Sequence, residues 1–328
     1  MSDELLHPRA WRLLQCLADG EFHSGEALAQ SLGTSRATVS NALVNVEQYG
    51  ISLQRVRGRG YRLATPWQRL DSAEIRHVLG DAQDEFGVEV VPQAQSSNTL
   101  LLQAALRGAP GGSVLAVELQ TAGRGRRGRV WQSGLGNGLT FSLLWRFAGG
   151  LNSLSGLSLA VGIAIVRTLR RFTVQDVYLK WPNDVLSRQG KLAGVLIEAQ
   201  GDMLGPSAVV IGIGLNYTLP TDVVRRLDQP ASGLDELCQQ MPTRNQLLAE
   251  ILLELSRVLP QFALGGFAVL REEWERVHYH QNRKVRLRMP DESVVRGIAC
   301  GMSDLGELCV QTGAGIVRLN AGEVEGVK

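Results

Sequence analysis

The first 50 residues alternate apolar and polar positions with the period of an α-helix. Three amphipathic segments, at residues 10–20, 24–33 and 34–50, each end at a glycine. Ser24 and Ser35 stand where the second and third segments begin, and serine is a preferred N-cap. Two helices joined by a short turn, the second with polar side chains in its first turns, are typical of a helix-turn-helix. The residues that the second helix would present to the major groove of DNA are Ser35, Arg36, Thr38, Ser40 and Asn41.

The pattern then changes to that of a β-hairpin. In residues 51–63, apolar residues alternate with arginines around two glycines. Arg55, Arg57 and Arg59 are two residues apart, so a strand would place them on one face. A basic hairpin directly after a helix-turn-helix is typical of the wing of a winged helix, and we predict that Arg57 and Arg59 contact DNA. The alternative is a small helical domain with a solvated arginine strand.

Short β-rich runs alternate with helical ones in the middle of the chain. After an expected linker at residues 64–71, strands are predicted at 113–120, 139–147 and 208–217, helices at 154–172 and 244–262, and a strand–loop–strand unit at 176–200. This mixed order predicts an α+β fold with a central sheet.

The last segment of the chain has a different pattern. Several short strands separated by turn signals follow residue 275, which predicts a small β-barrel. We therefore expect three domains, at residues 1–65, 66–274 and 275–328.

Composition narrows the class of protein. The 328 residues are 44% hydrophobic and 20% charged, as in ordinary globular proteins. A formal net charge of +2 excludes a generally polycationic nucleic-acid coat, so binding to polyanions needs local patches. The four cysteines form no C-x-x-C pair, which argues against a disulfide framework or zinc site and favours a reducing compartment. The first residues lack a signal-peptide pattern and no apolar run reaches the ~18 residues of a membrane span, so we expect a cytoplasmic protein.

One connection between predicted strands is long, glycine-rich and basic. Residues 123–131, "GRGRRGRVW", join the strands predicted at 113–120 and 139–147. Backbone amides and guanidinium groups in such a loop can surround an anion. Four arginines cannot all bind one phosphate, so some must be structural or solvated. A solvated basic loop and a nonspecific nucleic-acid patch are the alternatives.

Three further segments carry candidate chemistry. Asn183 and Asp184 in "KWPNDV" could hydrogen-bond a nucleotide or a water molecule bound to a metal ion, although both residue types also occur in ordinary turns. Lys191 follows Asp184 by seven residues, as on two arms of one hairpin; a lysine at the head of a buried strand is usually a surface residue. Glycines within the strand at 211–216 indicate a bulge or close approach of a ligand.

Taken together, five segments resemble the bacterial biotin protein ligases of the kind that also represses the biotin operon. Order and approximate spacing match in "SSN" (96–98), "QTAGRGRRGRVW" (120–131), "KWPNDV" (180–185), "GKLAG" (190–194) and "GIGLN" (212–216). The resemblance extends over the whole chain. It implies an N-terminal winged helix, a mixed-sheet ligase domain like that of class II synthetases, and a C-terminal SH3-like barrel.

The resemblance also implies a set of site residues. Those for biotin are Ser96, Ser97, Asn98, Gln120, Arg124, Gly125, Arg126, Lys191 and Gly194. Those for ATP are Arg126, Arg129, Trp131, Asn183, Asp184 and Asn216, with Asp184 also a weak or indirect Mg²⁺ contact. Lys191, Arg126 and Arg124 would be catalytic, and the arginine loop would close as a lid over biotin and the phosphates.

The implied reaction has two steps. Biotin and ATP give biotinyl-5′-AMP, and a lysine of a biotin carboxyl-carrier protein then attacks its acyl carbon. Cations placed beforehand stabilise the negative charge of the first transition state. Biotinyl-AMP would also be the corepressor that favours a homodimer on palindromic operator DNA.

The chain departs from the family pattern at three places. Ser97 stands where a threonine is common, Ser133-Gly134 replaces Ser-Pro, and the C-terminal arginine is missing unless Lys328 substitutes. Two other functions remain as alternatives: a transcription factor that senses a small molecule without catalysis, and a lipoate-type ligase. His278 and His280 are expected to be exposed strand residues rather than a metal site.

Overall fold

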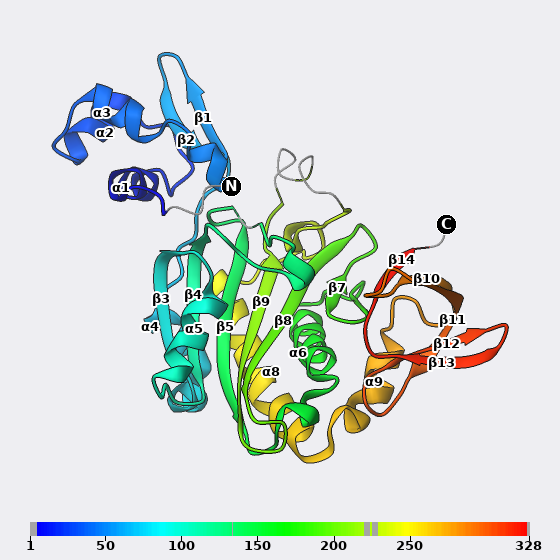
Figure 1. The fold of residues 1–328 in the computed structure, drawn as a ribbon. Coiled ribbons are helices and arrows are strands. Elements are labelled where there is room, and N and C mark those ends of the chain that lie inside the picture. Colours follow the sequence, from blue (N-terminus) through cyan, green and yellow to red (C-terminus); the bar gives the residue numbers. More distant parts are fainter. Residues whose placement is uncertain (1–4, 133, 220–223, 225–228, 327–328) are drawn as a thin grey trace.

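The computed structural model describes residues 5–132, 134–219, 224 and 229–326. Its N-terminal unit contains three helices and a hairpin (Figure 1). These elements are α1 (Pro8–Cys16), α2 (Gly25–Ser31), α3 (Arg36–Ala42), β1 (Leu53–Val56) and β2 (Gly60–Leu63).

Both predicted serine caps are confirmed. Ser24 Oγ accepts a hydrogen bond from the amide of Ala27 at 3.0 Å, and Ser35 Oγ accepts one from Thr38 at 3.2 Å. Each bond satisfies an amide that has no partner inside the helix. The third segment differs from the expectation because α3 ends at Ala42 and a 3₁₀ turn follows over Val46–Tyr49.

The wing is an antiparallel hairpin, but its arginines do not share one strand face. Pairing of β1 and β2 ends at Val56 and Gly60, so Arg57 and Arg59 lie in the connecting turn, where both are exposed. Arg55 remains on β1, where it pairs with Glu47 and donates to the Leu43 carbonyl at 2.6 Å. The expected row of arginines is therefore wrong: Arg55 supports the fold, whereas Arg57 and Arg59 form the tip.

The segment between the first two units is packed rather than loose. Trp67 is buried, stacks edge-to-face on Trp11 with centroids 5.1 Å apart, and donates from its indole nitrogen to Glu118 at 3.1 Å. Arg244 also binds the Glu118 carboxylate, at 2.6 Å, with both side chains buried. The linker thus joins the winged helix to the central sheet.

The central unit is built on a seven-stranded sheet in the order β3-β4-β5-β9-β8-β7-β6 (Figure 1). Only β3 and β4 pair in parallel; the other neighbours are antiparallel. The strands are β3 (Gly87–Ala94), β4 (Ser113–Gln120), β5 (Gly138–Phe147), β6 (Tyr178–Lys180), β7 (Asp184–Leu186), β8 (Lys191–Gly201) and β9 (Ser207–Asn216). The helices are α4 (Ser72–Leu79), α5 (Ser97–Leu106), α6 (Leu157–Arg171), α8 (Arg244–Gly265) and α9 (Arg271–Arg276).

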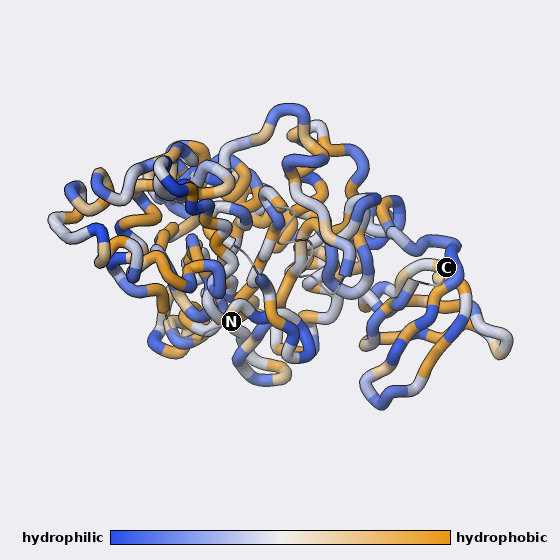
Figure 2. Tube along the Cα trace, turned by 90° about the horizontal axis from the view of Figure 1, so that it is seen from above, coloured by the Kyte–Doolittle hydropathy of each residue, from blue (hydrophilic) through white to orange (hydrophobic). Residues whose placement is uncertain are grey.

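Helices cover both faces of this sheet. Alternate residues of β4 show the division: Val114 and Ala116 belong to the core that includes α6 and α8, whereas Leu115 and Val117 pack with α5. Side chains of a strand point alternately to opposite faces, so one strand serves two cores. Hydrophobic stretches are frequent in the middle of the molecule, and many of the hydrophilic stretches lie at its periphery (Figure 2). The predicted α+β class with a central mixed sheet is confirmed.

The region predicted as strand–loop–strand at 176–200 contains three strands. The turn at residues 181–183 is short enough for β6 to pair with β7, and β7 then pairs with β8. Because the predicted loop is itself the turn of a hairpin, "KWPNDV" is held at the sheet edge between two strands.

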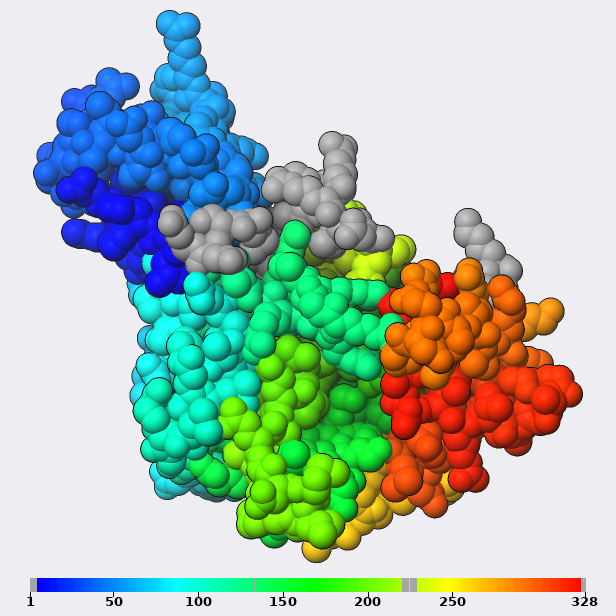
Figure 3. All heavy atoms as spheres, in the orientation of Figure 1, coloured from blue at the N-terminus to red at the C-terminus, as the bar shows by residue number. Residues whose placement is uncertain are grey.

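The C-terminal unit is a five-stranded antiparallel sheet in the order β13-β12-β11-β10-β14. Its strands are β10 (Lys284–Arg288), β11 (Val294–Met302), β12 (Leu308–Thr312), β13 (Gly315–Leu319) and β14 (Glu323–Gly326). No pairing over the described residues joins β13 to β14, so the structure supports the strands but not closure into a barrel. Its buried residues are continuous with the central core, and Figure 3 shows this unit at the opposite end from the winged helix.

His278 and His280 contradict the expectation of exposed strand positions. They lie in the turn after α9, and each is only 6% exposed. The His278 ring lies 4.6 Å from the Trp274 ring, centroid to centroid. Burial lowers the pKa of His278 to about 4 and that of His280 to about 3, so both rings are neutral at pH 7. Among the helices that the structure describes, none combines the length and apolar character needed to cross a membrane.

Candidate active site

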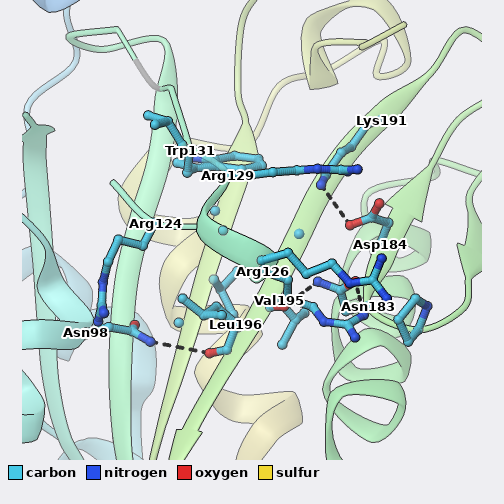
Figure 4. Close-up of a pocket in the computed structure, with 18 of the residues that line it drawn as sticks. Asn98, Arg124, Arg126, Arg129, Trp131, Asn183, Asp184, Lys191, Val195 and Leu196 are labelled. Carbon is cyan, nitrogen blue, oxygen red and sulfur yellow. Dashed lines mark hydrogen bonds and ion pairs between the residues drawn. The ribbon is translucent and has the colours of Figure 1, made fainter. Parts of the chain in front are cut away.

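The arginine segment, residues 123–131, folds over one side of the sheet as a compact loop, here called the lid (Figure 4). The amide of Gly125 donates to the Arg129 carbonyl at 2.7 Å, and that of Trp131 donates to the Gly123 carbonyl at 2.8 Å. Arg127 at the turn has φ +56, a left-handed conformation that is uncommon outside glycine. The lid thus has its own backbone hydrogen bonds and lies directly above the pocket.

The floor of the pocket, defined as Ser96, Ser97, Asn98 and Gln120, comes from the start of α5 and the end of β4. Ser96 caps α5. Ser97 donates to Gln120 Oε1 from its amide at 2.8 Å and from its hydroxyl at 3.1 Å. All four residues are buried, so their polar atoms are held by one another rather than by water.

Two glycines of β9 leave room for side chains that enter the pocket. A Cβ at Gly212 would lie 2.2 Å from Asn98 Oδ1, and a Cβ at Gly214 would lie 2.3 Å from Trp131 Cε2. The predicted bulge or close approach of a ligand is therefore, in this structure, a close approach of the Asn98 and Trp131 side chains to the sheet.

The hairpin of β7 and β8 brings Lys191 against Asp184. Lys191 Nζ lies 2.8 Å from Asp184 Oδ1 and 5.6 Å from the centroid of a Trp131 ring. Both side chains of the ion pair are 17% exposed. Lys191 therefore lines the pocket and is not a solvated strand terminus, and the predicted hairpin relationship with Asp184 is confirmed.

The four lid arginines have three partners, because Arg127 and Arg129 both lie against Glu323, with Arg127 Nη1 at 4.0 Å from its carboxylate. Arg124 pairs with Glu198 at 2.6 Å, Arg126 donates to Asn183 Oδ1 at 3.2 Å, and Arg129 pairs with Glu323 of the C-terminal unit. This arrangement agrees with the expectation that the four arginines do not all bind one anion.

The pocket is strongly basic. Six basic residues and two acidic residues line it; the basic ones are Arg124, Arg126, Arg127, Arg129, Lys180 and Lys191. Burial lowers the pKa of Arg126 and also that of Lys180. The hydrogen bond from Arg129 holds the pKa of Glu323 below its usual range. Partly desolvated cations of this kind attract an anionic ligand more strongly than solvated ones do.

The structure brings nearly all predicted ligand-site residues together around this pocket. Asn216 is the exception: its amide donates to the Lys191 carbonyl at 3.0 Å, and the residue is outside the pocket lining. Ser133 and Lys328, which carry two of the departures from the family pattern, lie outside the described residues. The predicted major-groove residues are exposed except Thr38, which is half-buried and whose hydroxyl lies 2.9 Å from that of Ser35.

Several residues of the site lacked a sequence prediction. Lys180 and Glu323 line the pocket, Ser142 lies 2.5 Å from Asn98 Oδ1, and Glu198 binds Arg124. Lys180 stands at the head of "KWPNDV" and offered a signal. Ser142 and Glu198 lie in regular strands without a motif around them, and only the sheet register places them at the site.

The pocket is basic, with a polar floor and a glycine-rich lid, which is typical of an enzyme for anionic substrates. The N-terminal winged helix adds a DNA-binding unit. Family comparisons agree with this class. Residues 90–216 match the biotin/lipoate A/B protein ligase family, residues 280–325 match the biotin protein ligase C-terminal domain, and residues 9–62 match a helix-turn-helix domain.

Similar proteins cover most of the chain. The bifunctional ligase/repressor BirA of Escherichia coli is 35% identical over 313 residues, 95% of each chain. Its counterpart in Bacillus subtilis is 30% identical over 311 residues, covering 94% of this chain and 95% of that one. The biotin–[acetyl-CoA-carboxylase] ligase of Mycobacterium tuberculosis is 34% identical over 261 residues, covering 78% and 95%.

Among solved structures, the Aquifex aeolicus biotin protein ligase in complex with biotin and ATP superposes with a TM-score of 0.61 at 28% identity. It covers 73% of this chain and 97% of that one. The chain belongs to the family of bifunctional biotin protein ligases that are also transcriptional repressors.

Proposed function

We propose that this chain activates biotin with ATP, transfers it to a lysine of a biotin carboxyl-carrier protein, and represses transcription when loaded with biotinyl-5′-AMP. The observation that carries the proposal is the pocket that joins Lys191 and the lid arginines to the buried polar floor.

In the first step, a carboxylate oxygen of biotin attacks the α-phosphorus of ATP and diphosphate leaves. Two anions must approach each other, and negative charge spreads over the phosphate oxygens in the transition state. Lys191, Arg124 and Arg126 are the cations that we assign to this charge. Arginine bonds two oxygens with its planar fork, and lysine supplies a compact charge.

The floor suits the neutral polar end of biotin. Buried hydroxyl and amide groups of Ser96, Ser97 and Gln120 offer donors and acceptors for a ureido group, and Asn98 shapes the floor beside them. Gly125 and Gly194 lack side chains where lid and strand approach the ligand.

The opposite side of the pocket suits the nucleotide. We assign phosphate contacts to Arg126 and Arg129, the adenine surface to Trp131, and polar contacts to Asn183 and Asp184. Asn216 contributes by holding the Lys191 backbone.

A magnesium ion would be held mainly by ATP. Mg²⁺ commonly binds one or two protein carboxylates together with substrate phosphates. The described residues contain no group of three or more His, Cys, Asp or Glu side chains that suits a metal, and the Asp184 carboxylate is paired with Lys191. Asp184 fits a weak or indirect contact, and the ion would neutralise phosphate charge.

In the second step, the carrier lysine attacks the acyl carbon of biotinyl-AMP, and AMP leaves. The Mycobacterium tuberculosis relative is named for the modification of acetyl-CoA carboxylase, which supports a carrier domain as the acceptor. The lid would keep water from the mixed anhydride until that acceptor arrives.

For repression, we propose a homodimer that places two winged helices on a palindromic operator. The DNA contacts would come from the exposed start of α3 and from Arg57 and Arg59 at the wing tip.

We further propose that the three domains divide at residues 65 and 274, that the central unit is related to class II synthetases, and that the C-terminal unit is an SH3-like barrel. The last two statements rest on the family resemblance. All four cysteines are free, which supports a cytoplasmic site of action.

The direct test supplies ATP, labelled biotin or lipoate, and a biotin-acceptor domain. Biotin transfer with release of AMP and diphosphate is expected, and transfer of lipoate alone would contradict the assignment. Binding of operator DNA, with and without biotinyl-AMP and at a stated salt concentration, tests repression separately.

A further inference from the structure

A single carboxylate oxygen connects the lid to the floor. Glu198 Oε2, on β8, accepts a hydrogen bond from Asn98 Nδ2 at 2.9 Å and one from Arg124 Nη2 at 2.6 Å. Figure 4 shows Arg124 directed from the lid toward Asn98. Hydrogen bonds to a charged group are stronger than those between neutral groups. The Asn98 amide and the Arg124 guanidinium are therefore both held at a fixed position on β8.

The orientation of Asn98 is fixed on every side. The side chain is 3% exposed, and its Oδ1 lies 2.5 Å from Ser142 Oγ. Its Nδ2 donates to Glu198 and lies 3.4 Å from the Leu196 carbonyl. Both amide hydrogens therefore face β8, and Asn98 is a link between strands rather than a donor to the ligand.

The link continues into the floor. Ser142 Oγ lies 2.7 Å from Ser97 Oγ, and Ser97 donates to Gln120 Oε1. A continuous chain of polar contacts thus runs from the floor to the lid through Gln120, Ser97, Ser142, Asn98, Glu198 and Arg124.

We propose that Glu198 is a positioning residue that fastens the Arg124 end of the lid to the floor and so retains the acyl-adenylate. This inference rests on the ligase function proposed above. Arg124 is 43% exposed, so its ion pair with Glu198 is accessible to solvent and can open and close. A ligand that occupies the floor keeps Ser97 and Asn98 in place, and Glu198 transmits that placement to Arg124. The lid then stays shut while the reactive intermediate is present.

The substitutions E198Q and E198A test this role. Glutamine keeps the side-chain volume and one acceptor oxygen but loses the charge, and alanine removes both contacts. E89Q changes an exposed carboxylate on β3 and is the matched control. E198Q also serves if E198A does not fold.

The first measurement follows biotinyl-AMP without an acceptor. We expect release and hydrolysis to rise about tenfold in E198A and less in E198Q. The rate of adenylate formation at saturating biotin and ATP should fall by a smaller factor, because Arg124 keeps its charge and loses only the contact that positions it. A purely structural role would instead lower all rates together. Wild-type release rates in both variants would overturn the proposal.

The second measurement uses trypsin, which cleaves after the lid arginines. Biotin with ATP should protect the lid in the wild type and in E89Q, and this protection should be lost in E198A. If the wild type forms no biotinyl-AMP, the ligase function fails. If it forms biotinyl-AMP and E198A keeps full protection, only the role of Glu198 fails.

Discussion

Lys191 and Asp184 form an ion pair of 2.8 Å across the hairpin of β7 and β8. In this register Asp184 faces Gly194, where a Cβ would lie 3.2 Å from Lys191 Nζ. The glycine leaves the space into which the lysine side chain folds. Asp184 therefore holds the Lys191 ammonium inside the pocket.

The first prediction concerns this pair. K191M removes the cation and should lower biotinyl-AMP formation by about 100-fold or more, the scale at which preorganised charge acts in transition states. D184N should have a smaller effect because the ammonium remains. Diphosphate release with biotin and ATP measures both. K284M, an exposed lysine on β10, is the control and should retain full activity. Near-normal diphosphate release by K191M would contradict the assignment.

The second prediction concerns the glycines of β9. G214A would place a methyl group 2.3 Å from Trp131 Cε2, so the indole has to leave the sheet. We expect weaker nucleotide binding, measured by calorimetric titration with ATP, at nearly unchanged thermal stability. G87A on β3 has open space around its added methyl group and should change neither quantity. Equal ATP affinities of the two variants would show that Trp131 has no part in nucleotide binding.

The third prediction concerns the buried pair Glu118–Arg244. E118Q leaves the Arg244 guanidinium without a countercharge in the core, which commonly costs about 3–5 kcal/mol of unfolding free energy. E272Q breaks an exposed pair with Arg276 and should cost at most about 1 kcal/mol. Urea unfolding followed by circular dichroism compares the two variants. A smaller loss for E118Q than for E272Q would be the contrary result.

The fourth prediction concerns pH. His278 and His280 have folded pKa values of about 4 and about 3, below the unfolded value of 6.5. Between pH 6.5 and about 4 the unfolded chain binds protons that the folded chain does not, so stability falls as pH decreases. The loss at pH 5 is about 2 kcal/mol per histidine.

The substitution H280F tests the origin of this loss. Nδ1 of His280 is buried, without a hydrogen-bond partner over the described residues, so phenylalanine leaves no polar atom unpaired. The variant should lose part of the pH dependence between pH 7 and 5, measured by urea unfolding. If the free energy of unfolding of H280F depends on pH as steeply as that of the wild type, His280 is not a source of the pH dependence.

The fifth prediction concerns DNA. R57A removes an exposed cation at the wing tip and should weaken operator binding while lowering the slope of log K against log salt by about 1. Binding titrations at several salt concentrations measure that slope. R276A, a similarly exposed arginine on α9, should leave it unchanged. A loss of affinity at constant slope would argue against a phosphate contact by Arg57.

The sequence by itself predicted the helices of the winged helix and several strands of the sheet, and the family resemblance supplied most of the residues that line the pocket. Serine caps, glycine stops and helical periodicity depend on neighbours within a few residues, so the helices of the winged helix were predictable. The five co-linear motifs likewise marked the lid, the β7–β8 hairpin and the glycines of β9, because chemistry restricts residue types there.

Tertiary structure decided what those motifs contact. Glu198 and Ser142 are unremarkable along the chain, and they join the site only because β8, β9 and β5 are neighbours in one sheet. His278 and His280 alternate as exposed strand residues would, yet both are buried, and the His278 ring packs against Trp274. The local sequence pattern indicates the backbone conformation that a segment favours. Burial and ion pairing depend instead on residues far apart in the sequence, as in the pair of Arg124 and Glu198.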